Sequence, residues 1–303
     1  MKADDKIKLT KGLKLSRIVH GHWRLKEWNF SKQDLLKLIE QAIELGVTSF
    51  DHADIYGNYE CEQLFGDALS VKKGLRKKMQ LITKCGIKLK SDKNPLQKIK
   101  YYDYSCKHIV ASAERSLVNL KTDHIDLLLL HRPSPFLDPE EVAKAFEQLK
   151  KSGKILFFGV SNFLPGQLDM LASYLDPPIV TNQVEISPYA LEHFENGNMD
   201  HFLACKIKPM AWSPLAGGKL LNPQDEKGRR IFNVLTEVAR ELDIDIIENI
   251  IYAWLLKHPA GIIPVAGTGK AERIKYASDA LNIEMSLEQW FRIYNASKGR
   301  DLP

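Results

Sequence analysis

Eight short apolar runs alternate along the chain with longer segments of helical spacing, and this alternation constrains the fold more than any other feature. The apolar runs lie at 16–21, 47–53, 79–84, 125–131, 155–161, 179–185, 208–213 and 261–267. The clearest helical patterns between them cover 31–46, 105–120 and 138–153. Because strands that alternate with helices usually pair in parallel, eight such units predict an α/β fold, a (β/α)8 TIM barrel.

The three clearest helical patterns carry signals at their ends. Ser31 and Asp138 stand where a side-chain oxygen can cap the first helical N–H groups, and Pro139 occupies the first helical position after Asp138. Gly46 and Gly153 follow the last apolar positions, where a residue of left-handed conformation commonly ends a helix. These signals predict where each helix begins and ends.

Segments outside the eightfold repeat predict additions to the barrel. The stretch 7–16 is typical of a β-hairpin ahead of the first barrel strand, and helical patterns at 229–243, 246–258 and 286–299 exceed the minimal repeat. An open, doubly wound sheet is the rival architecture, but its GxGxxG phosphate fingerprint does not occur in the chain. No linker or compositional break divides the sequence, so a single domain over 1–303 is expected.

The composition is that of a soluble globular protein, with 44% hydrophobic and 27% charged residues among 303. The longest apolar run, at 250–256, is far shorter than the ~20 residues of a membrane-spanning helix, and the N-terminus lacks the apolar segment of a secretory signal. Four cysteines without a CxxC pair are typical of reduced thiols, so we expect a cytoplasmic protein without membrane attachment. The mild net charge of +5, without interleaved aromatic residues, argues against nucleic-acid binding.

Ionisable side chains end three consecutive strands of the predicted barrel. Asp51 ends the second, Lys84 the third and His131 the fourth, and Tyr56 follows in the loop after Asp51. Chemistry in such barrels collects at the C-terminal ends of the strands. We therefore expect these four side chains to converge on one site.

The four residue types suit a proton donor that faces a carbonyl group. A tyrosine has a reference pKa of about 10, and a nearby lysine ammonium is expected to lower the pKa of Tyr56 towards neutrality. A buried lysine tends to lose its proton, and the carboxylate of Asp51 would keep Lys84 charged. A neutral His131 could then donate a hydrogen bond to a substrate oxygen and orient it.

The motifs FDHADIYG, ITK, LLLLH, GVSNF and AWSPLAGG occur in the order and at spacings similar to those of the aldo-keto reductase superfamily, which the chain resembles over essentially its whole length. The ending EQWFRIYNASKGRDLP and the segment VHGHWRLKEWNFS resemble a bacterial branch of predicted oxidoreductases. The resemblance implies a nicotinamide-dependent reductase of small carbonyl substrates in an (α/β)8 barrel. Asp51, Tyr56, Lys84 and His131 match the family's catalytic tetrad, with Tyr56 as general acid.

The same resemblance implies a set of residues that bind NADPH. Ser161, Asn162 and Gln183 match those that hydrogen-bond the nicotinamide carboxamide, and Trp212 matches the aromatic residue on which the nicotinamide ring stacks. The remaining matches follow the first strand, cover the pyrophosphate or bind the adenosine phosphate: Gly21, Trp23, Ser213, Leu215, Gly217, Lys219, Gly267, Thr268, Lys270 and Arg273. Lysine and arginine at the last two positions favour a 2′-phosphate, and hence NADPH over NADH.

The sequence departs from the family pattern in its adenine contacts and in its substrate loops. Tyr276 and Ala277 stand where the family often has an acidic residue or an asparagine near the adenine. The long segment 86–104 is expected to shape the substrate pocket in place of a C-terminal loop. A predicted apolar substrate wall, for which ordinary packing is the alternative, consists of Trp23, Tyr101, Tyr102 and Phe163.

Two other functions fit part of the sequence. The first is a barrel that binds NADPH and reports redox state to a protein partner with little turnover, because such a site can keep the same tetrad. The second is a metal-dependent hydrolase that uses His20 and His22, since an H-x-H at the end of the first strand can supply two ligands. The eighth apolar run ends without the carboxylate that such a centre needs, so no metal is expected.

Overall fold

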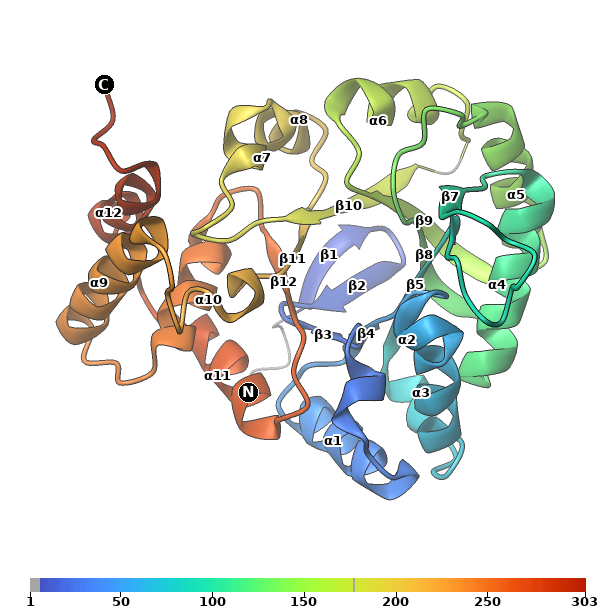
Figure 1. The fold of residues 1–303 in the computed structure, drawn as a ribbon, viewed down its shortest axis with the longest axis horizontal. Helices are drawn as coiled ribbons and strands as arrows, with labels where there is room; N and C mark the ends of the chain where they lie inside the picture. Colours follow the sequence, from blue (N-terminus) through green and yellow to red (C-terminus); the bar gives the residue numbers. More distant parts are fainter. Residues whose placement is uncertain (1–5, 177) are drawn as a thin grey trace.

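The computed structural model describes residues 6–176 and 178–303, and a closed barrel of eight parallel strands forms its centre (Figure 1). Neighbouring strands follow the chain order, and the last barrel strand pairs with the first. The strands are β3 (Val19–Gly21), β4 (Ser49–Asp51), β5 (Gln80–Cys85), β8 (Ile125–Leu130), β9 (Ile155–Ser161), β10 (Ile179–Glu185), β11 (Met210–Trp212) and β12 (Ile263–Ala266). Each coincides with one of the eight apolar runs, and only β5 extends past its run, by Cys85, so the predicted TIM barrel is confirmed.

Helices cover the outside of the barrel (Figure 1). The α-helices of seven or more residues are α1 (Lys32–Glu44), α3 (Cys61–Leu69), α4 (Cys106–Leu120), α5 (Pro139–Lys151), α6 (Pro165–Ala172), α8 (Asn198–Ala204), α9 (Glu226–Glu241), α10 (Ile247–Lys257), α11 (Ala271–Asp279) and α12 (Leu287–Lys298). The short helices are α2 (Tyr56–Tyr59), α7 (Glu192–Glu195) and the 3-10 turns η1 (Leu25–Trp28), η2 (Leu75–Lys78), η3 (Ala216–Gly218) and η4 (Ala280–Asn282).

The predicted signals mark the ends of α1 and α5. The Ser31 side chain accepts a hydrogen bond from the backbone of α1, and the Asp138 side chain does the same for α5. Pro139 occupies the first turn of α5, where its missing N–H removes no helical hydrogen bond. Gly46 and Gly153 follow these helices with φ of +80° and +70°, a conformation that glycine adopts without strain.

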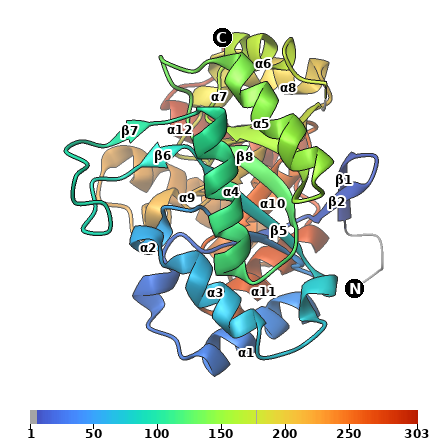
Figure 2. The same ribbon diagram turned by 90° about the vertical axis from the view of Figure 1, so that its right-hand side faces the viewer.

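The expected N-terminal hairpin closes one end of the barrel. Its strands β1 (Lys6–Thr10) and β2 (Leu13–Ser16) pair antiparallel. Leu13 and Leu15 are buried with the side chains that fill the barrel interior. Figure 2 shows this hairpin on the side of the barrel opposite β6 and β7, so it lies far from the mouth described below.

The barrel wall separates two apolar layers, and β8 shows how one strand serves both. Leu127 and Leu129 point into the barrel interior, whereas Leu128 and Leu130 join the core between strands and helices. Alternate residues of a strand face opposite sides, and a parallel strand that is covered on both sides is apolar throughout. This explains the continuous leucine run at 127–130.

The segment 86–104 contains a small hairpin that the sequence pattern did not reveal. Its strands β6 (Ile87–Lys88) and β7 (Tyr101–Tyr102) pair antiparallel, and the connection between them projects from the barrel (Figure 2). A two-residue strand in a lysine-rich segment has too little alternation to be recognised. The hairpin places residues of this segment beside the barrel mouth.

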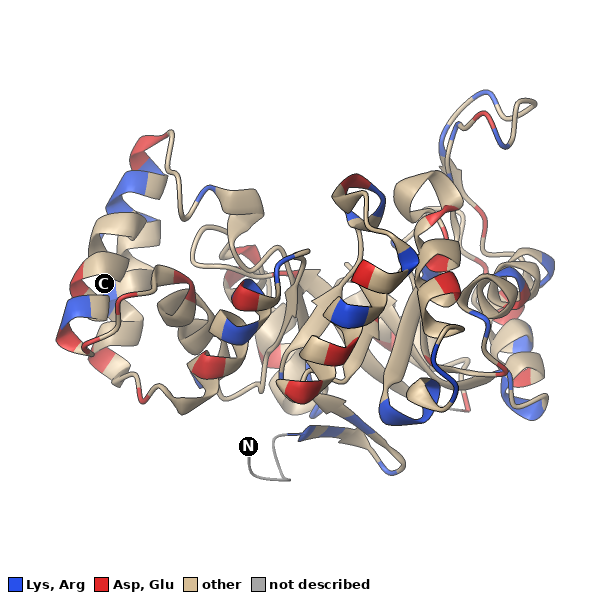
Figure 3. Cartoon of the chain, turned by 90° about the horizontal axis from the view of Figure 1, so that it is seen from below, with Lys and Arg blue, Asp and Glu red and all other residues tan. Residues whose placement is uncertain are grey.

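The additional helices pack together at one side of the barrel, as Figure 1 shows for α9, α10 and α12. Trp254 on α10 and Trp290 on α12 stack with ring centroids 4.9 Å apart, and each indole N–H donates to the backbone carbonyl of the other residue. Acidic and basic residues are interspersed over the outer helices in Figure 3. Among the described residues, no helix combines the length and the apolar character that crossing a membrane requires.

Candidate active site

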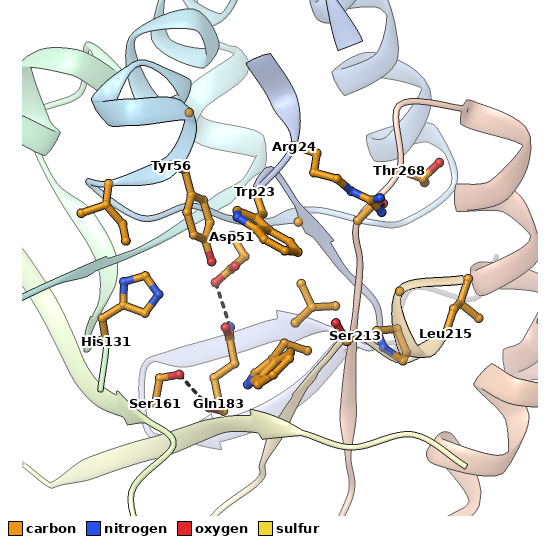
Figure 4. Close-up of a pocket in the computed structure, with 18 of the residues that line it drawn as sticks. Trp23, Arg24, Asp51, Tyr56, His131, Ser161, Gln183, Ser213, Leu215 and Thr268 are labelled. Carbon is orange, nitrogen blue, oxygen red and sulfur yellow. Dashed lines mark hydrogen bonds between the residues drawn. The ribbon is translucent and has the colours of Figure 1, made fainter. Parts of the chain in front are cut away.

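Four polar side chains meet at the C-terminal ends of neighbouring barrel strands. Asp51 is the last residue of β4, Lys84 is the penultimate residue of β5, and His131 directly follows β8. Tyr56 begins α2, a few residues after Asp51. Figure 4 shows Tyr56, Asp51 and His131 around one space, as the strand-end pattern predicted for these positions.

The ammonium group of Lys84 is the centre of this cluster. Its Nζ donates to Asp51 Oδ2 at 2.6 Å, Asp51 Oδ1 at 2.8 Å and the carbonyl oxygen of His52 at 2.9 Å. It also lies 3.1 Å from the phenol oxygen of Tyr56. The Lys84 side chain is only 1% exposed. Because a buried unpaired charge is strongly unfavourable, Asp51 is what allows a charged lysine here.

Burial and charge have opposite effects on the pKa values of Lys84 and Tyr56. Burial lowers the pKa of Lys84, but Asp51 and Tyr56 together outweigh it and raise the pKa above its usual value. Burial raises the pKa of Tyr56, and the charge of Lys84 offsets only part of that rise. The predicted net lowering of the Tyr56 pKa is therefore wrong, although the direction of the Lys84 effect is right. Tyr56 carries its proton at neutral pH and can donate it.

His131 is a neutral imidazole beside this phenol. Burial is the largest cause that lowers its pKa well below the usual value, and the charges of Lys84, Arg132 and Lys100 act in the same direction. Its ring meets that of Tyr56 edge to face, with centroids 5.8 Å apart. A neutral imidazole can donate one hydrogen bond to a substrate oxygen that also reaches the phenol.

The cluster opens into a cavity of about 630 Å³ at the barrel mouth (Figure 4). Asp51, Tyr56 and His131 line the cavity, and Lys84 lies buried behind them. Most of the predicted cofactor residues line the same cavity: Gly21, Trp23, Ser161, Asn162, Gln183, Trp212, Ser213, Leu215, Gly217, Gly267, Thr268 and Arg273. Residues that are distant in sequence are thus brought to one place.

A chain of hydrogen bonds fixes the amide side chains on one wall of the cavity. Asn162 donates from Nδ2 to Ser161 Oγ at 2.7 Å, and Ser161 Oγ donates to the carbonyl oxygen of Gln183 at 2.8 Å. The indole N–H of Trp212 donates to Asn162 Oδ1 at 3.0 Å. Gln183 Nε2 donates to Asp51 Oδ1 at 2.9 Å, which links this wall to the cluster around Lys84. Asn162 has φ of +63°, a strained conformation that is common at functional sites.

The backbone on the other side of the cavity is open to a ligand. Gly217 and Gly218 have φ of +67° and +99°, and a Cβ at either would meet nothing within 4 Å. At Gly267 the nearest atom to such a Cβ is 3.9 Å away. Exposed glycine backbone of this kind lets phosphate groups approach N–H groups closely. Together with the flat indole of Trp212 and the amide wall, this arrangement fits a nicotinamide dinucleotide.

Arg273 lies at the same side of the cavity but is already paired. Its Nη2 lies 3.1 Å from Glu248 Oε1, and Nε lies 3.3 Å from the same oxygen. Both side chains line the cavity. Arg273 therefore faces the cavity with its guanidinium, and Glu248 holds this guanidinium in place and partly neutralises it.

Two lysines from the predicted cofactor set do not line the cavity. The Lys219 ammonium lies over the ring of Tyr189, 5.1 Å from its centroid. Lys270 is the residue before α11, and its backbone N–H donates to Thr268 Oγ1 at 3.1 Å while its side chain is exposed. Long flexible side chains turn towards other partners without disturbing the backbone, so sequence position alone does not place them.

Of the predicted substrate wall, only Trp23 lines the cavity, with a largely exposed indole, and its contact with a substrate stays a prediction. Phe163 is wrong, because its side chain is 1% exposed inside the core between strands and helices. Tyr101 and Tyr102 lie in β7 and do not line the cavity, and the Tyr101 ring lies under the Lys88 ammonium instead. Ordinary packing therefore accounts for Phe163 and Tyr102, whereas Tyr101 is exposed.

Other residues that line the cavity were not predicted. Two of them, Arg132 and Lys100, are cations near His131, and a third cation, Arg24, lies near the glycine loops. The others are apolar or polar residues at the rim: Ile55, Asn58, Ile87 and Leu89. Arg132 could have been found, since it directly follows the strand-end His131 and chemistry gathers at such positions. Lys100 and Leu89 belong to the segment 86–104 that was expected to shape the pocket, but no pattern singled them out, because the hairpin of β6 and β7 brings them to the mouth.

His20 and His22 belong to the packed interior rather than to a metal centre. His20 Nε2 lies 2.8 Å from the carbonyl oxygen of Thr268. His22 stacks on His52 with ring centroids 4.6 Å apart, and Phe65 packs edge-on against both rings. Within 6–176 and 178–303, the residues grouped closely enough to hold a metal lie outside the cavity: Asp169, His201 and Cys205. These contacts do not support the hydrolase.

A buried carboxyl lies close in sequence to Tyr56. Burial raises the pKa of Asp54 to about 7, although a hydrogen bond from Ser112 lowers it. Ser112 Oγ on α4 donates to Asp54 Oδ2 at 2.6 Å, and Oδ1 has no hydrogen-bond partner among the described residues. Asp54 is therefore a group that changes charge near neutral pH.

Comparisons with known proteins identify the family to which the chain is similar. The model of the aldo/keto reductase family matches residues 17–298. The chain is 51% identical over 298 residues to the "Uncharacterized oxidoreductase YcsN" of Bacillus subtilis, covering 98% of this chain and 99% of that protein. It is 40% identical over 298 residues to a 6-dehydroglucose reductase of Agrobacterium fabrum, with coverage of 98% and 99%.

A solved structure shows the same fold. A glycerol dehydrogenase from Gluconobacter oxydans has a TM-score of 0.83 with this structure, covering 97% of this chain and 95% of that one, at 22% sequence identity. The family model and the two relatives each cover nearly the whole chain. The chain belongs to the aldo/keto reductase family of oxidoreductases.

Proposed function

We propose that the protein reduces an aldehyde or ketone to an alcohol, with NADPH as the hydride donor and Tyr56 as the general acid. Bound NADPH would supply the hydride that the carbonyl carbon accepts, which is the chemistry of the cofactor. The residues of the chain orient the carbonyl group and deliver the proton to its oxygen.

The proton transfer is assigned to the cluster around Lys84. Tyr56 donates its proton to the carbonyl oxygen as negative charge develops there, and His131 donates a second hydrogen bond that orients the same oxygen. The Lys84 ammonium, 3.1 Å from the phenol oxygen, stabilises the phenolate that remains. Asp51 keeps Lys84 charged throughout the reaction.

The observation that carries this proposal is the set of contacts around Lys84 Nζ. One buried ammonium touches both a carboxylate that it neutralises and a phenol that lines the cavity. A lysine needed only for structure could be replaced by an apolar residue, since buried ion pairs add little stability over well-packed apolar side chains. The contact between Lys84 Nζ and the phenol of Tyr56, which lines the cavity, is therefore best explained by a role in proton transfer.

Different residues of the cavity suit different groups of the cofactor. Trp212 offers a flat surface for the nicotinamide ring, Asn162 and Gln183 offer amide groups for its carboxamide, and the backbone around Gly217 is open to the pyrophosphate. Arg273 is assigned to the 2′-phosphate, which underlies the proposed preference for NADPH over NADH.

The experiment that tests this function follows the oxidation of NADPH and of NADH at 340 nm with a panel of carbonyl compounds. The panel includes 6-dehydroglucose, since two relatives at 40% and 36% identity carry the name 6-dehydroglucose reductase. Turnover with NADPH that exceeds turnover with NADH is expected. The alternative, a barrel that binds NADPH with little turnover, predicts tight binding of NADPH without reduction of any compound on the panel.

A further inference from the structure

Arg132 is built into the active site with a rigid backbone. The buried phenol of Tyr104 donates to the carbonyl oxygen of Arg132 at 2.5 Å and accepts from its N–H at 3.0 Å. Gly86 makes room for this phenol, because a Cβ there would lie 2.0 Å from the Tyr104 ring. The N–H and the carbonyl oxygen of Arg132 are thus both held by Tyr104, so the Arg132 side chain starts from a fixed position next to His131.

The side chain of Arg132 lines the cavity, and its guanidinium lies over the ring of Trp212. Its guanidinium carbon is 5.6 Å from the centroid of the Trp212 ring, so it extends across the mouth from β8 towards β11. Among the residues that the structure describes, no hydrogen bond or ion pair engages this guanidinium. Burial raises the pKa of Glu185 on β10, and the charge of Arg132 offsets part of that rise without an ion pair between the two groups.

Lys100 brings a second positive charge to the same part of the cavity. It lines the cavity from the end of the connection between β6 and β7, and its ammonium also forms no ion pair within the described ranges. Arg132 and Lys100 both lie close enough to His131 to depress its pKa, after burial and Lys84. Both cations therefore line the cavity near His131, the residue proposed to hold the carbonyl oxygen.

Arg132 reaches Trp212, the proposed surface for the nicotinamide ring, but Arg132 and Lys100 start from a different part of the chain than the open glycine backbone proposed for the cofactor's phosphates. Figure 4 shows His131 on one side of the cavity and Thr268 and Leu215 on the other, beyond Trp23. Arg132 directly follows His131, whereas the open glycine backbone and Arg273 lie on the side of β11 and β12. An anionic group that meets Arg132 beside His131 is therefore assigned to the substrate rather than to the phosphates of the cofactor.

We propose that Arg132 and Lys100 bind an anionic group, a carboxylate or a phosphate, on the carbonyl substrate; this inference rests on the function proposed above. A planar guanidinium matches two oxygens of either group, and a desolvated charged hydrogen bond is among the strongest polar contacts in proteins. The protein would therefore be selective for aldehydes or ketones that carry such an anion a few bonds from the carbonyl carbon.

The test compares carbonyls that differ in charge. Succinic semialdehyde and glyceraldehyde 3-phosphate carry the two anions, and butyraldehyde and glyceraldehyde are their neutral counterparts. We expect kcat/KM for an anionic compound to exceed that of its counterpart by roughly 10- to 100-fold, the range for hydrogen bonds to charged groups. The pair with the larger ratio tells whether the site prefers carboxylate or phosphate.

Substitutions test whether Arg132 is responsible for the ratio of kcat/KM between an anionic compound and its neutral counterpart. Arg132→Met is expected to lower it by about tenfold or more, and Arg132→Lys, which keeps the charge but not the fork, by less. Lys100→Met should also lower it. Lys98→Met is the matched control, because it removes the same charge from the same segment but does not line the cavity, and it should leave the ratio unchanged.

A binding measurement separates this inference from the proposed function. The protein loaded with NADP+ is titrated with 4-hydroxybutyrate and with 1-butanol, the two reduction products, and at least tenfold tighter binding of the anion, lost in Arg132→Met, is expected. If no carbonyl is reduced but this preference is found, the proposed function fails and the anion site stands. Equal ratios for charged and neutral compounds, a ratio that Arg132→Met does not change, or a neutral sugar aldehyde preferred over both anions would each overturn the inference.

Discussion

At the scale of single residues, the candidate site depends on charges whose neighbours determine what they do. Lys84 stays charged because Asp51 contacts it, and Tyr56 keeps its proton because burial outweighs the nearby ammonium. Arg273 lies against Glu248, whereas Arg132 has no comparable partner in the described part of the chain. The two arginines therefore differ in how much charge they offer to a ligand.

Arg273→Ala is expected to weaken NADPH binding by roughly 10- to 100-fold and NADH binding by less than about threefold, because only NADPH carries the 2′-phosphate. Glu248 would then repel that phosphate, so Arg273→Ala with Glu248→Gln should recover part of the lost affinity. Quenching of tryptophan fluorescence measures both dissociation constants, and Arg240→Ala, on the exposed surface of α9, is the control. Equal losses for the two cofactors would contradict the assignment.

Asp54 predicts a pH dependence of stability. Its pKa is about 7 in the folded protein and near 4 in an unfolded chain, so the folded state binds the proton more tightly. The stability that this proton contributes is complete below pH 4 and is lost as the pH rises through 7. Between pH 5 and 8 the loss amounts to roughly 2–3 kcal/mol.

Asp54→Asn should remove this pH dependence while it keeps an amide oxygen for Ser112. Urea unfolding at pH 5 and at pH 8 gives the free energy of unfolding of both proteins. The variant is expected to lose less stability than the wild type between the two values. The same loss in both proteins would show that Asp54 does not titrate in this range.

At the scale of elements, the barrel strands position the catalytic cluster and the hairpin of β6 and β7 shapes one wall of the cavity. The strands place Asp51, Lys84 and His131 side by side because β4, β5 and β8 are hydrogen-bonded neighbours. The hairpin supplies Ile87 and, just beyond its strands, Leu89 and Lys100. A rigid barrel with a variable loop at its mouth is a common way to change specificity without changing chemistry.

Replacing residues 89–100 by Asn-Gly should change the order in which carbonyl compounds are preferred. Asn-Gly forms a two-residue turn that suits the pairing of Lys88 with Tyr101, so the hairpin can still close. The variant loses the wall formed by Leu89 and Lys100. Relative kcat/KM values over the panel are expected to shift about tenfold for anionic compounds, and an unchanged order would mean that the segment has no part in substrate choice.

At the scale of the whole molecule, the candidate site and the N-terminal hairpin lie at opposite ends of the barrel. The N-terminal hairpin fills one end with Leu13 and Leu15, and the cavity occupies the other. Substitutions in the hairpin are therefore expected to change stability more than catalysis.

Leu15→Ala should lower the free energy of unfolding by about 2–5 kcal/mol, because it leaves a cavity in the barrel interior. Lys14→Ala is the matched control on the same strand, since that side chain is exposed and should change stability by less than about 0.5 kcal/mol. Urea unfolding followed by tryptophan fluorescence measures both. A loss in Leu15→Ala no larger than in the control would show that the hairpin is not part of the core.

Periodicity and strand-end chemistry predicted the parts of the molecule that depend on the regular repeat. Alternating apolar runs are sufficient for the barrel, and the polar residues near the ends of these runs are sufficient for the positions of Asp51, Lys84 and His131. Burial is a property of the folded chain, so the net pKa of Tyr56 could not be derived. Phe163 was misplaced because the positive φ of Asn162 redirects the chain, and the amide of Asn182 then holds the Phe163 backbone in the core.

The most direct test of the central claim is to compare Tyr56→Phe with the wild type in two assays, carbonyl reduction under saturating NADPH and binding of NADPH. Loss of a general acid typically lowers the rate by about 100- to 10,000-fold. We predict a loss of kcat in that range with an NADPH dissociation constant within about threefold of the wild type, and no change for the exposed control Tyr174→Phe. Substantial reduction by Tyr56→Phe, or an equal loss of cofactor binding, would contradict the assignment of Tyr56 as the proton donor.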